Sequence, residues 1–314
     1  MPRAASTAAR GVSSKVTQWM PRIRTVTAFP AARGLSSKAD MNVILAELPK
    51  VYGKAFSQIF PLYNSIVEKV STSLGDKPPT AILDLGCGPG EPGLTLATAY
   101  PDAHVLVTDN NDDMLAKATA RVADAGVQNA EVCKVDVSDL ASIPDGSQDV
   151  VTASLLLHIT QDEARDTAVS EIARVLRPGG GVLVASVWEE MPHMKVMGKV
   201  MKDLTGEAVP LPFDPFGFSR EVSDEMFAEA GLGAVKHEVV PLDFNMGDVN
   251  DDQTWKLGMI IHLAKILEMA GSDPTVIERV KEAFATRCKE EGLLTARGEL
   301  AMVGHFRTMT AVKP

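Results

Sequence analysis

Residues 82–90 read ILDLGCGPG, and this stretch decides the fold. An apolar run that contains one acid, Asp84, predicts a buried strand. The run leads into three glycines at alternate positions: Gly86, Gly88 and Gly90. Glycine lets the backbone adopt conformations that other residues avoid and come close to a ligand. A helix that begins just after this turn would offer unpaired N–H groups to an anionic group. The stretch therefore predicts a strand, a ligand-binding turn and a helix.

Short apolar runs and helical patterns alternate on both sides of this stretch. The runs predict strands at 81–85, 103–108, 130–135, 149–157 and 181–187. Helical spacing predicts helices at 93–99, 112–125 and 162–176. Strands that alternate with helices indicate βαβ units and a parallel sheet. Nearly continuous apolar strands are typical of a sheet that is covered on both faces.

The segments that flank this core are less regular. Residues 41–74 show helical spacing with a predicted break at Pro61. Met191, Met194, Met197 and Met201 approximate helical spacing, a pattern that favours core packing over a ligand pocket. Farther along the chain, the pattern predicts a helix at 223–230, a strand at 234–244, two helices within 252–291 and a closing strand at 299–312.

Composition excludes several protein classes. The chain has 314 residues, of which 45% are hydrophobic and 23% charged, as in an ordinary folded protein. Three cysteines are too few for a disulfide scaffold or a four-cysteine zinc site, and they predict free thiols. No apolar run is long enough for a transmembrane helix. A net charge of −10 argues against a nucleic-acid partner.

The first 39 residues differ from the rest of the chain, because they contain seven Lys or Arg and no Asp or Glu. They are rich in Ser, Thr and Ala, which is typical of an organelle transit peptide. Arg33 lies two residues before the bond after Leu35, as in a mitochondrial processing site. Cleavage there would remove six positive charges and change the net charge from −10 to −16. We expect a mitochondrial location, with a plastid as the alternative; a disordered basic tail without a targeting role is the other interpretation.

The residues 88–93 also satisfy the G-x-G-x-x-G string of a dinucleotide site, which is weak by itself. The acids at the strand ends separate the alternatives. Asp84, Asp109 and Asp136 each fall at or just after one of the first three predicted strands. Together with the turn at 176–180, these landmarks follow the order found in class I S-adenosylmethionine-dependent methyltransferases, which residues 50–190 resemble. The resemblance implies an α/β, doubly wound, Rossmann-like fold with a seven-stranded, mostly parallel sheet and a helical cap over the active site.

The resemblance also implies S-adenosylmethionine as cofactor and a set of residues that bind it. Gly86, Gly88 and Gly90 would pass under its methionine part, with Asp84 near the amino group. Asp109 would accept from both ribose hydroxyls, as an acid about 20 residues after the glycines can. The remaining cofactor-binding candidates flank the adenine or meet the methionine end: Asn110, Met114, Asp136, Val137, Ser154 and Leu155. Alternatives are helix packing for Met114 and a solvated turn for Asp136.

Catalysis by methyl transfer needs a base only where the acceptor must lose a proton. His158 is the candidate because it follows the fourth strand at the cofactor-facing rim, although a structural histidine is an equally natural interpretation. Tyr52 and Trp188 are candidates for lining the acceptor pocket, with core packing as the alternative. The spacing of the histidines indicates no metal site. Cys87 lies in the glycine turn and is not interpreted as a nucleophile.

The acceptor is the least determined part. We expect four regions: a transit peptide (1–39), N-terminal cap helices (40–79), a cofactor-binding core (80–188), and a substrate cap that also completes the sheet (189–314). Covering helices favour a small-molecule acceptor, methylated on O, N, S or an activated carbon, over nucleic acid. The layout resembles the small-molecule methyltransferases that act on quinone rings and natural products. An organelle protein methyltransferase and a non-catalytic assembly factor are the alternatives, and the oligomeric state stays open.

Overall fold

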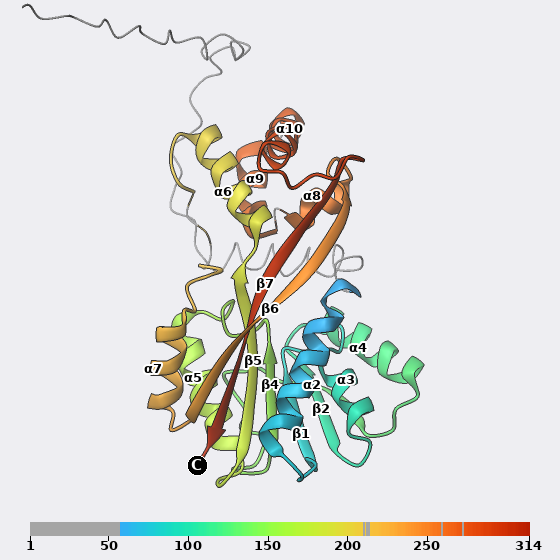
Figure 1. Ribbon diagram of the computed structural model, residues 1–314, viewed down its shortest axis with the longest axis vertical. Helices are drawn as coiled ribbons and strands as arrows, with labels where there is room; N and C mark the ends of the chain where they lie inside the picture. The colour runs from blue at the N-terminus through green and yellow to red at the C-terminus, as the bar shows by residue number, and fades with distance from the viewer. Residues whose placement is uncertain (1–56, 210, 212–213, 259, 272) are drawn as a thin grey trace, which may run out of the picture. The chain divides into compact units, whose positions relative to one another are not determined.

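The computed structural model describes residues 57–209, 211, 214–258, 260–271 and 273–314, and all of these belong to one compact unit. Its centre is a seven-stranded sheet with the order β3-β2-β1-β4-β5-β7-β6 (Figure 1). The strands are β1 (Ala81–Leu85), β2 (His104–Asp109), β3 (Ala130–Lys134), β4 (Val150–Ser154), β5 (Gly181–Glu190), β6 (Gly233–Asp248) and β7 (Glu299–Lys313). The first five pair in parallel, and β7 is antiparallel to both β5 and β6. The predicted fold class is confirmed.

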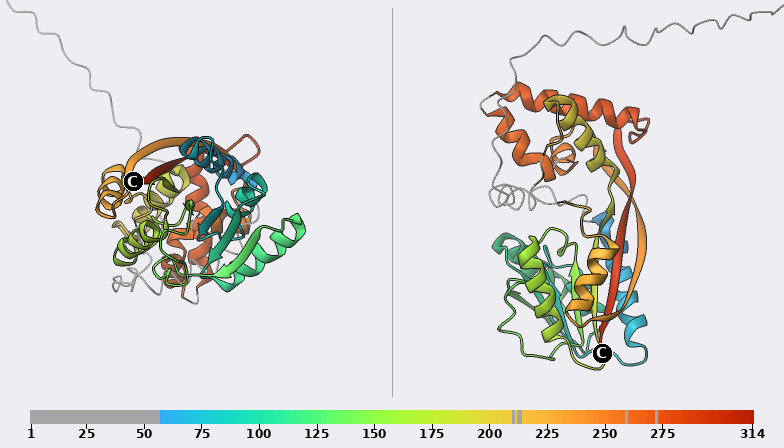
Figure 2. Two further views of the ribbon diagram at one scale, coloured as in Figure 1. Left: turned by 90° about the horizontal axis from the view of Figure 1, so that it is seen from below. Right: turned by 90° about the vertical axis from the view of Figure 1, so that its left-hand side faces the viewer.

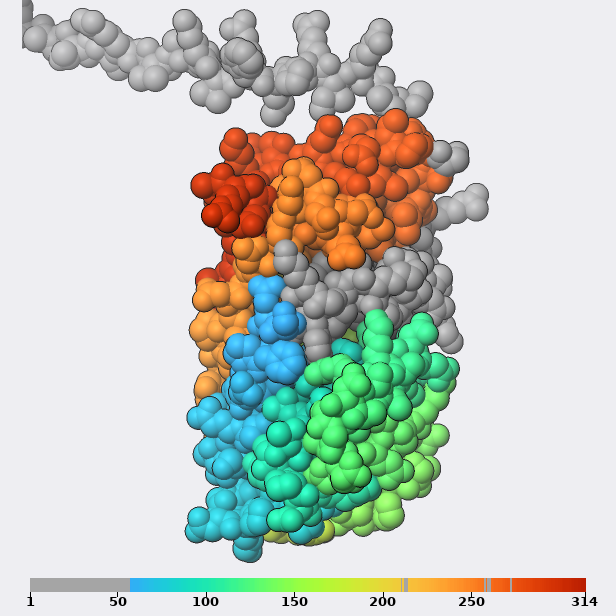
Figure 3. Space-filling view, turned by 90° about the vertical axis from the view of Figure 1, so that its right-hand side faces the viewer, coloured from blue at the N-terminus to red at the C-terminus, as the bar shows by residue number. Residues whose placement is uncertain are grey.

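Helices cover both faces of the sheet. One face carries α2 (Phe60–Leu74), α3 (Gly93–Ala99) and α4 (Asp112–Ala125), whose residues lie side by side in Figure 3. The other carries α5 (Asp162–Val175) and α7 (Arg220–Glu229) (Figure 1). Alternate residues of each strand feed two apolar clusters, because successive side chains point to opposite faces. In β1, Ile82 joins the α2–α4 cluster while Leu83 and Leu85 join the α5–α7 cluster.

Most predicted boundaries hold within one or two residues, and two differ instructively. The fourth strand ends at Ser154 instead of 157, because Leu155 has a φ of 55° and the chain turns there. The predicted helix at 41–74 lies partly outside the described residues. Its described part is a 3₁₀ turn, η1 (Ser57–Ile59), followed by α2, with Pro61 in the first turn. Proline is favourable in that position because no intrahelical bond is lost.

The strands β6 and β7 are much longer than the parallel strands and extend beyond them as a two-stranded ribbon (Figures 1 and 2). At its far end the ribbon carries α8 (Asp252–Gly258), η2 (Ile260–His262), α9 (Leu263–Ala270) and α10 (Pro274–Glu290). The helix α6 (Pro192–Thr205) follows β5 and packs against α10, α8 and β7. The cap is therefore built on the same strands that complete the sheet.

The cap has an apolar interior that is continuous with the α2–α4 side of the core. Met191, Met194, Met197 and Met201 are all buried within it, so core packing is the role that the structure shows. The predicted helical break near 271–274 is present, since α9 ends at Ala270 and α10 begins at Pro274 after the N-cap Asp273. The prediction of two helices within 252–291 is wrong in number, because α8, η2 and α9 precede that break. Among the described helices, none has the length and apolar character needed to span a bilayer.

Candidate active site

The glycine turn joins β1 to α3 at the carboxyl edge of the parallel strands. Gly86, Gly88 and Gly90 have φ values of 64°, 54° and 106°, which favour glycine at each position. A Cβ at Gly86 would lie 2.8 Å from Leu156 Cδ1, and one at Gly90 would lie 3.3 Å from the Ala118 backbone. A Cβ at Gly88 would meet nothing within 4 Å. The turn is thus packed on both flanks and open at Gly88, where a ligand can approach the backbone.

Asp84 is fully buried and braces this turn from below. Its Oδ2 accepts the Gly93 N–H at 2.8 Å, and its Oδ1 accepts the Thr152 hydroxyl at 2.6 Å. Burial is the largest influence on its pKa and raises it to about 8, against the lowering effect of those two bonds. The structure therefore gives Asp84 a bracing role, joining β1, α3 and β4, that the sequence did not indicate. Its predicted place near the cofactor's amino group stays a prediction.

Asp109 ends β2 and is bonded directly to the glycine turn. Its Oδ2 accepts the Gly88 N–H at 2.8 Å, and its Oδ1 accepts the Asn111 N–H at 2.9 Å. Partial burial raises its pKa, and its backbone hydrogen bonds oppose that shift. A carboxylate oxygen can accept more than one hydrogen bond, so Asp109 keeps capacity for ligand hydroxyls. This geometry suits the predicted ribose contact.

The candidates around the predicted adenine position lie on two neighbouring turns. Asp136 is exposed after β3, and its Oδ1 accepts the Ser138 N–H and hydroxyl at 2.9 and 2.6 Å. Those bonds lower its pKa, and the Asn110 side chain contributes in the same direction. Val137 is half-buried against the α5–α7 cluster, and Met114 in α4 is 5% exposed. The turns after β2 and β3 are thereby linked through Asn110 and Asp136.

The turn after β4 carries the remaining predicted contacts. Ser154 Oγ lies 2.9 Å from Ser186 Oγ on β5, and the Leu155 N–H donates to the Ser186 carbonyl at 2.9 Å. The left-handed conformation of Leu155 is unusual for a residue with a side chain. Such strain is tolerated where surrounding contacts enforce it, which is common at functional sites.

His158 and Trp188 lie against one another at this rim. Their ring centroids are 4.5 Å apart, with the planes at 66°. His158 is buried, which lowers its pKa to about 3, with a smaller contribution from Arg165. The imidazole is therefore neutral near pH 7 and a weak base, because a general base works best with a pKa near the working pH. This favours the structural interpretation of His158. Tyr52 lies outside the described residues.

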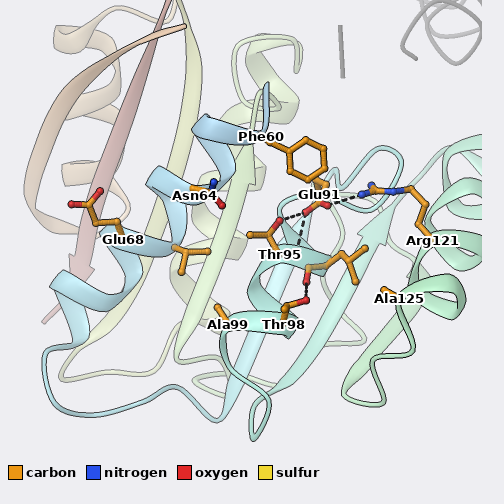
Figure 4. A pocket seen from close by; sticks show the side chains of 11 residues that line it. Phe60, Asn64, Glu68, Glu91, Thr95, Thr98, Ala99, Arg121 and Ala125 are labelled. Carbon is orange, nitrogen blue, oxygen red and sulfur yellow. Dashed lines mark hydrogen bonds and ion pairs between the residues drawn. The ribbon is translucent and has the colours of Figure 1, made fainter. Parts of the chain in front are cut away.

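Glu91 and Arg121 form a second brace that sequence reasoning missed (Figure 4). Arg121 pairs with Glu91 at 2.7 Å and donates to the Pro89 carbonyl in the glycine turn at 2.8 Å. Glu91 also accepts from the Thr95 N–H and hydroxyl. The pair borders a cavity of about 640 Å³ between α2, α3 and α4. Glu91 adjoins the motif, but its partner is 30 residues away and had no local signal.

The cysteines are free thiols, as predicted. Cys87, Cys133 and Cys288 are free, and burial raises the pKa of the Cys87 thiol, which makes it a poor nucleophile. Within the described ranges, no three His, Cys, Asp or Glu residues gather as metal ligands would.

The residues of this site fit S-adenosylmethionine, because the backbone at Gly88 is open and the carboxylates of Asp109 and Asp136 lie at the same carboxyl edge of the parallel strands. The glycines would hold its methionine part, Asp109 the ribose hydroxyls and Asp136 the adenine amine. Asp84 and Glu91 would act indirectly, since their carboxylates hold the turn in place.

Residues 82–180 match the family model described as "Methyltransferase domain". The chain is 32% identical over 191 residues to a malonyl-[acyl-carrier protein] O-methyltransferase of Dechloromonas aromatica. The aligned residues cover 58% of this chain and 65% of that protein. It is 38% identical over 107 residues to a ribosomal RNA large subunit methyltransferase G of Streptomyces coelicolor, covering 33% of this chain and 28% of that protein. The chain thus spans less than two thirds of each relative.

The crystal structure of the YcgJ protein from Bacillus subtilis has the same fold. It superposes with a TM-score of 0.52 at 18% identity, over 80% of this chain and 98% of that one. The matched residues include the glycine turn and the acids Asp84, Asp109 and Asp136. Residues 82–180 therefore form a methyltransferase domain, and for this domain the predicted resemblance to the class I S-adenosylmethionine-dependent methyltransferases and the predicted cofactor are confirmed.

Proposed function

We propose that this chain is an enzyme that transfers a methyl group from S-adenosylmethionine to a small-molecule acceptor. The observation that carries the proposal is the bond from the Gly88 N–H to Asp109, beside a backbone left open at Gly88. This bond brings the glycine turn and the carboxylate that we predict to bind the ribose together, at the edge where doubly wound folds bind ligands. The methyltransferase domain around it supports the same function.

When bound, S-adenosylmethionine supplies a methyl group on a sulfonium, which is a good leaving group. The protein is then required mainly to orient the acceptor and exclude water. The braces at Asp84 and Glu91 hold the turn under the methionine part. The turn after β4 and the end of β5 provide the neighbouring rim, on which Trp188 and His158 lie.

The neutral state of His158 is relevant to whether the acceptor atom must lose a proton before it is methylated. With a pKa near 3, its imidazole takes up a proton too weakly to activate a phenol or a carbon acid at pH 7. We therefore propose an acceptor atom that needs no proton removed by this residue, such as a carboxylate oxygen, a thioether, or an amine that is already neutral when it binds. The printed name of the Dechloromonas relative places its methyl group on oxygen, which is compatible with a carboxylate acceptor.

Two other functions remain as alternatives. An organelle protein methyltransferase would need an acceptor side open to a peptide, and an assembly factor would need no catalytic turnover. The relative named for ribosomal RNA raises nucleic acid as a third acceptor class. The net charge of −10 disfavours that class, because binding phosphates depends on a positive surface. We also propose the mitochondrial location, with the plastid as the alternative, on the basis of the first 39 residues alone.

The test is to incubate the full chain with methyl-labelled S-adenosylmethionine and an organelle extract split into small-molecule, protein and RNA fractions. Label in the small-molecule fraction supports the proposal, and its mass identifies the acceptor. Label in protein or RNA replaces it with the corresponding alternative. Cofactor binding by calorimetry without label in any fraction would favour the assembly factor. The Asp109→Ala variant controls for transfer by contaminating enzymes.

A further inference from the structure

The rim that carries Trp188 contains a β-bulge. On β5 and β7, Trp188 pairs with Phe306 and Glu190 pairs with His305, so Glu189 is the extra residue. A bulge re-aims the neighbouring side chains, and bulges often lie next to active sites. The direction of Trp188 toward His158 therefore depends on what holds Glu189.

Glu189 is held by a buried arginine on the adjacent strand. Arg307 is 2% exposed, and its Nε lies 2.7 Å from Glu189 Oε2 as an ion pair. The same guanidinium donates to the Phe218 carbonyl, and it lies 3.4 Å from His237 Nδ1 and 3.5 Å from Ser223 Oγ. The arginine of this ion pair is buried and the Glu189 side chain is 33% exposed, so loss of Glu189 would leave a buried positive charge short of one partner.

A second arginine holds the turn that carries His158. Arg165 of α5 donates from Nε to the Leu157 carbonyl and from an Nη to the Thr160 carbonyl, both at 2.6 Å. Its guanidinium lies 5.3 Å from the centroid of the buried Phe218 ring. Phe218 thus meets both arginines, one through its ring and the other through its carbonyl.

These contacts close a ring around the rim: His158, its turn, Arg165, Phe218, Arg307, Glu189, Trp188 and back to His158. We propose that Arg165 and Arg307 are positioning residues that, through Phe218 and Glu189, fix the His158–Trp188 pair as a rigid wall of the acceptor site. The acceptor role of that wall rests on the proposed function, whereas the fixing of the pair does not. Arg307 contacts none of the predicted cofactor-binding residues, so its loss should act on the acceptor alone, whereas Arg165 also holds the turn that carries Ser154 and Leu155.

The first test measures how firmly the His158–Trp188 pair is held, and it requires no acceptor. The full chain is labelled with 5-fluorotryptophan, and Trp188→Phe identifies the Trp188 signal in the ¹⁹F spectrum. We expect Arg307→Met and Arg165→Met each to shift or broaden that signal. Arg165 does not touch Trp188 directly and acts on it only through the closed chain of contacts described above. The Trp255 signal, from the buried side chain in the cap, should stay in place.

Arg174→Met is the matched control. Arg174 is as richly bonded, to Glu171, Asp145 and the carbonyls of Leu140 and Ile143, but it lies beside the amino end of β4, where its carbonyl accepts the Gly146 N–H. If the Trp188 signal in the Arg165 and Arg307 variants matches that of the Arg174 variant, the proposal is overturned. Should Arg307→Met fail to fold, Glu189→Gln tests the same pair with its shape kept.

The second test separates positioning from general destabilisation. We expect Arg307→Met to raise the acceptor KM at least tenfold, with S-adenosylmethionine affinity changed less than twofold, and Arg307→Lys to recover part of the loss. Equal losses of acceptor and cofactor binding would overturn the proposal. If the wild-type chain transfers no methyl group, the proposed function fails while the ¹⁹F comparison still decides whether the ring holds the pair.

Discussion

The two halves of the sheet use different kinds of contact at their carboxyl-end rim. In the parallel half, β1 to β4 are five or six residues long, and the turns at their ends use backbone N–H groups and a few carboxylates. In the antiparallel half, β6 and β7 are 16 and 15 residues long and extend past that edge to the cap. There the rim depends on side chains, including the bulge at Glu189 and its buried arginine. A cofactor shared by a whole family suits the first arrangement, and an acceptor specific to one protein suits the second.

The largest effect should come from Asp84, the brace of the parallel half. Asp84→Ala leaves the Gly93 N–H and the Thr152 hydroxyl without their acceptor, and each such loss costs about 1–3 kcal/mol. Asp84→Asn can keep both bonds, because the amide oxygen accepts from Gly93 and the amide N–H donates to Thr152. We expect the free energy of unfolding, measured in urea, to fall sharply in the alanine variant only. Equal losses in both variants would show that the charge, and not the hydrogen bonds, is what matters.

Asp84 also makes stability depend on pH in a defined direction. Its folded-state pKa is about 8, against 3.8 for an unperturbed carboxyl, so between these values the folded chain holds a proton that the unfolded chain releases. Its contribution is present in full below about pH 4 and is lost as the pH rises toward 8. Asp84→Asn should flatten the slope of unfolding free energy over that interval relative to the wild-type chain.

The next effect concerns cofactor affinity. Asp109→Ala removes a charged acceptor from the predicted ribose contact and frees the Gly88 N–H that it holds. A hydrogen bond to a charged group contributes about 1.5–3 kcal/mol, so S-adenosylmethionine affinity should fall at least tenfold in calorimetry. Asp112→Ala is the control, because Asp112 is exposed and pairs with the surface Lys134. Affinity unchanged by both substitutions would remove Asp109 from the cofactor site.

A smaller effect is expected where the antiparallel half meets η1. The Gln58 side chain donates to the Asn245 carbonyl at 3.1 Å and accepts the Asn245 N–H at 2.6 Å, beside the irregularity at Asn245–Gly247. Gln58→Ala should lower the unfolding free energy by about 1 kcal/mol, since exposed hydrogen bonds contribute little each. Gln128→Ala, which loses one bond to Gly126 in the parallel half, should cost less. Cofactor affinity should be the same in both.

The smallest expected effect is on the pH profile of turnover. His158 has a pKa near 3 and stays neutral from pH 5 to 9, so His158→Gln should lower the rate without altering the shape of the profile. A wild-type limb near pH 6 to 7 that disappears in the variant would restore His158 as the general base. Trp188→Phe is the companion variant, because it removes the other ring of the pair while leaving the imidazole.

The sequence was most informative where function is carried by local pattern. The glycine turn, the strand ends at Leu85 and Asp109, and the helix at 112–125 follow from neighbouring residues, so their positions were predicted closely. The side of the rim that depends on long-range contacts was not predicted from the sequence. Arg307 meets Phe218 and Glu189 across more than 80 residues, and no spacing signals such a contact. The bracing role of the buried Asp84 was also missed, because Asp84 follows the pattern of a ligand-binding acid although both its oxygens are bonded within the protein.

The order of the strands has a consequence for biosynthesis. β7 is the last of the seven strands in the chain, yet it lies between β5 and β6. While the chain is being made, β5 and β6 both lack this neighbour until Glu299–Lys313 has left the ribosome. Unpaired strand edges are where chains associate wrongly. A nascent or prematurely terminated chain would therefore expose two such edges together with the cap, and would depend on chaperones at that stage.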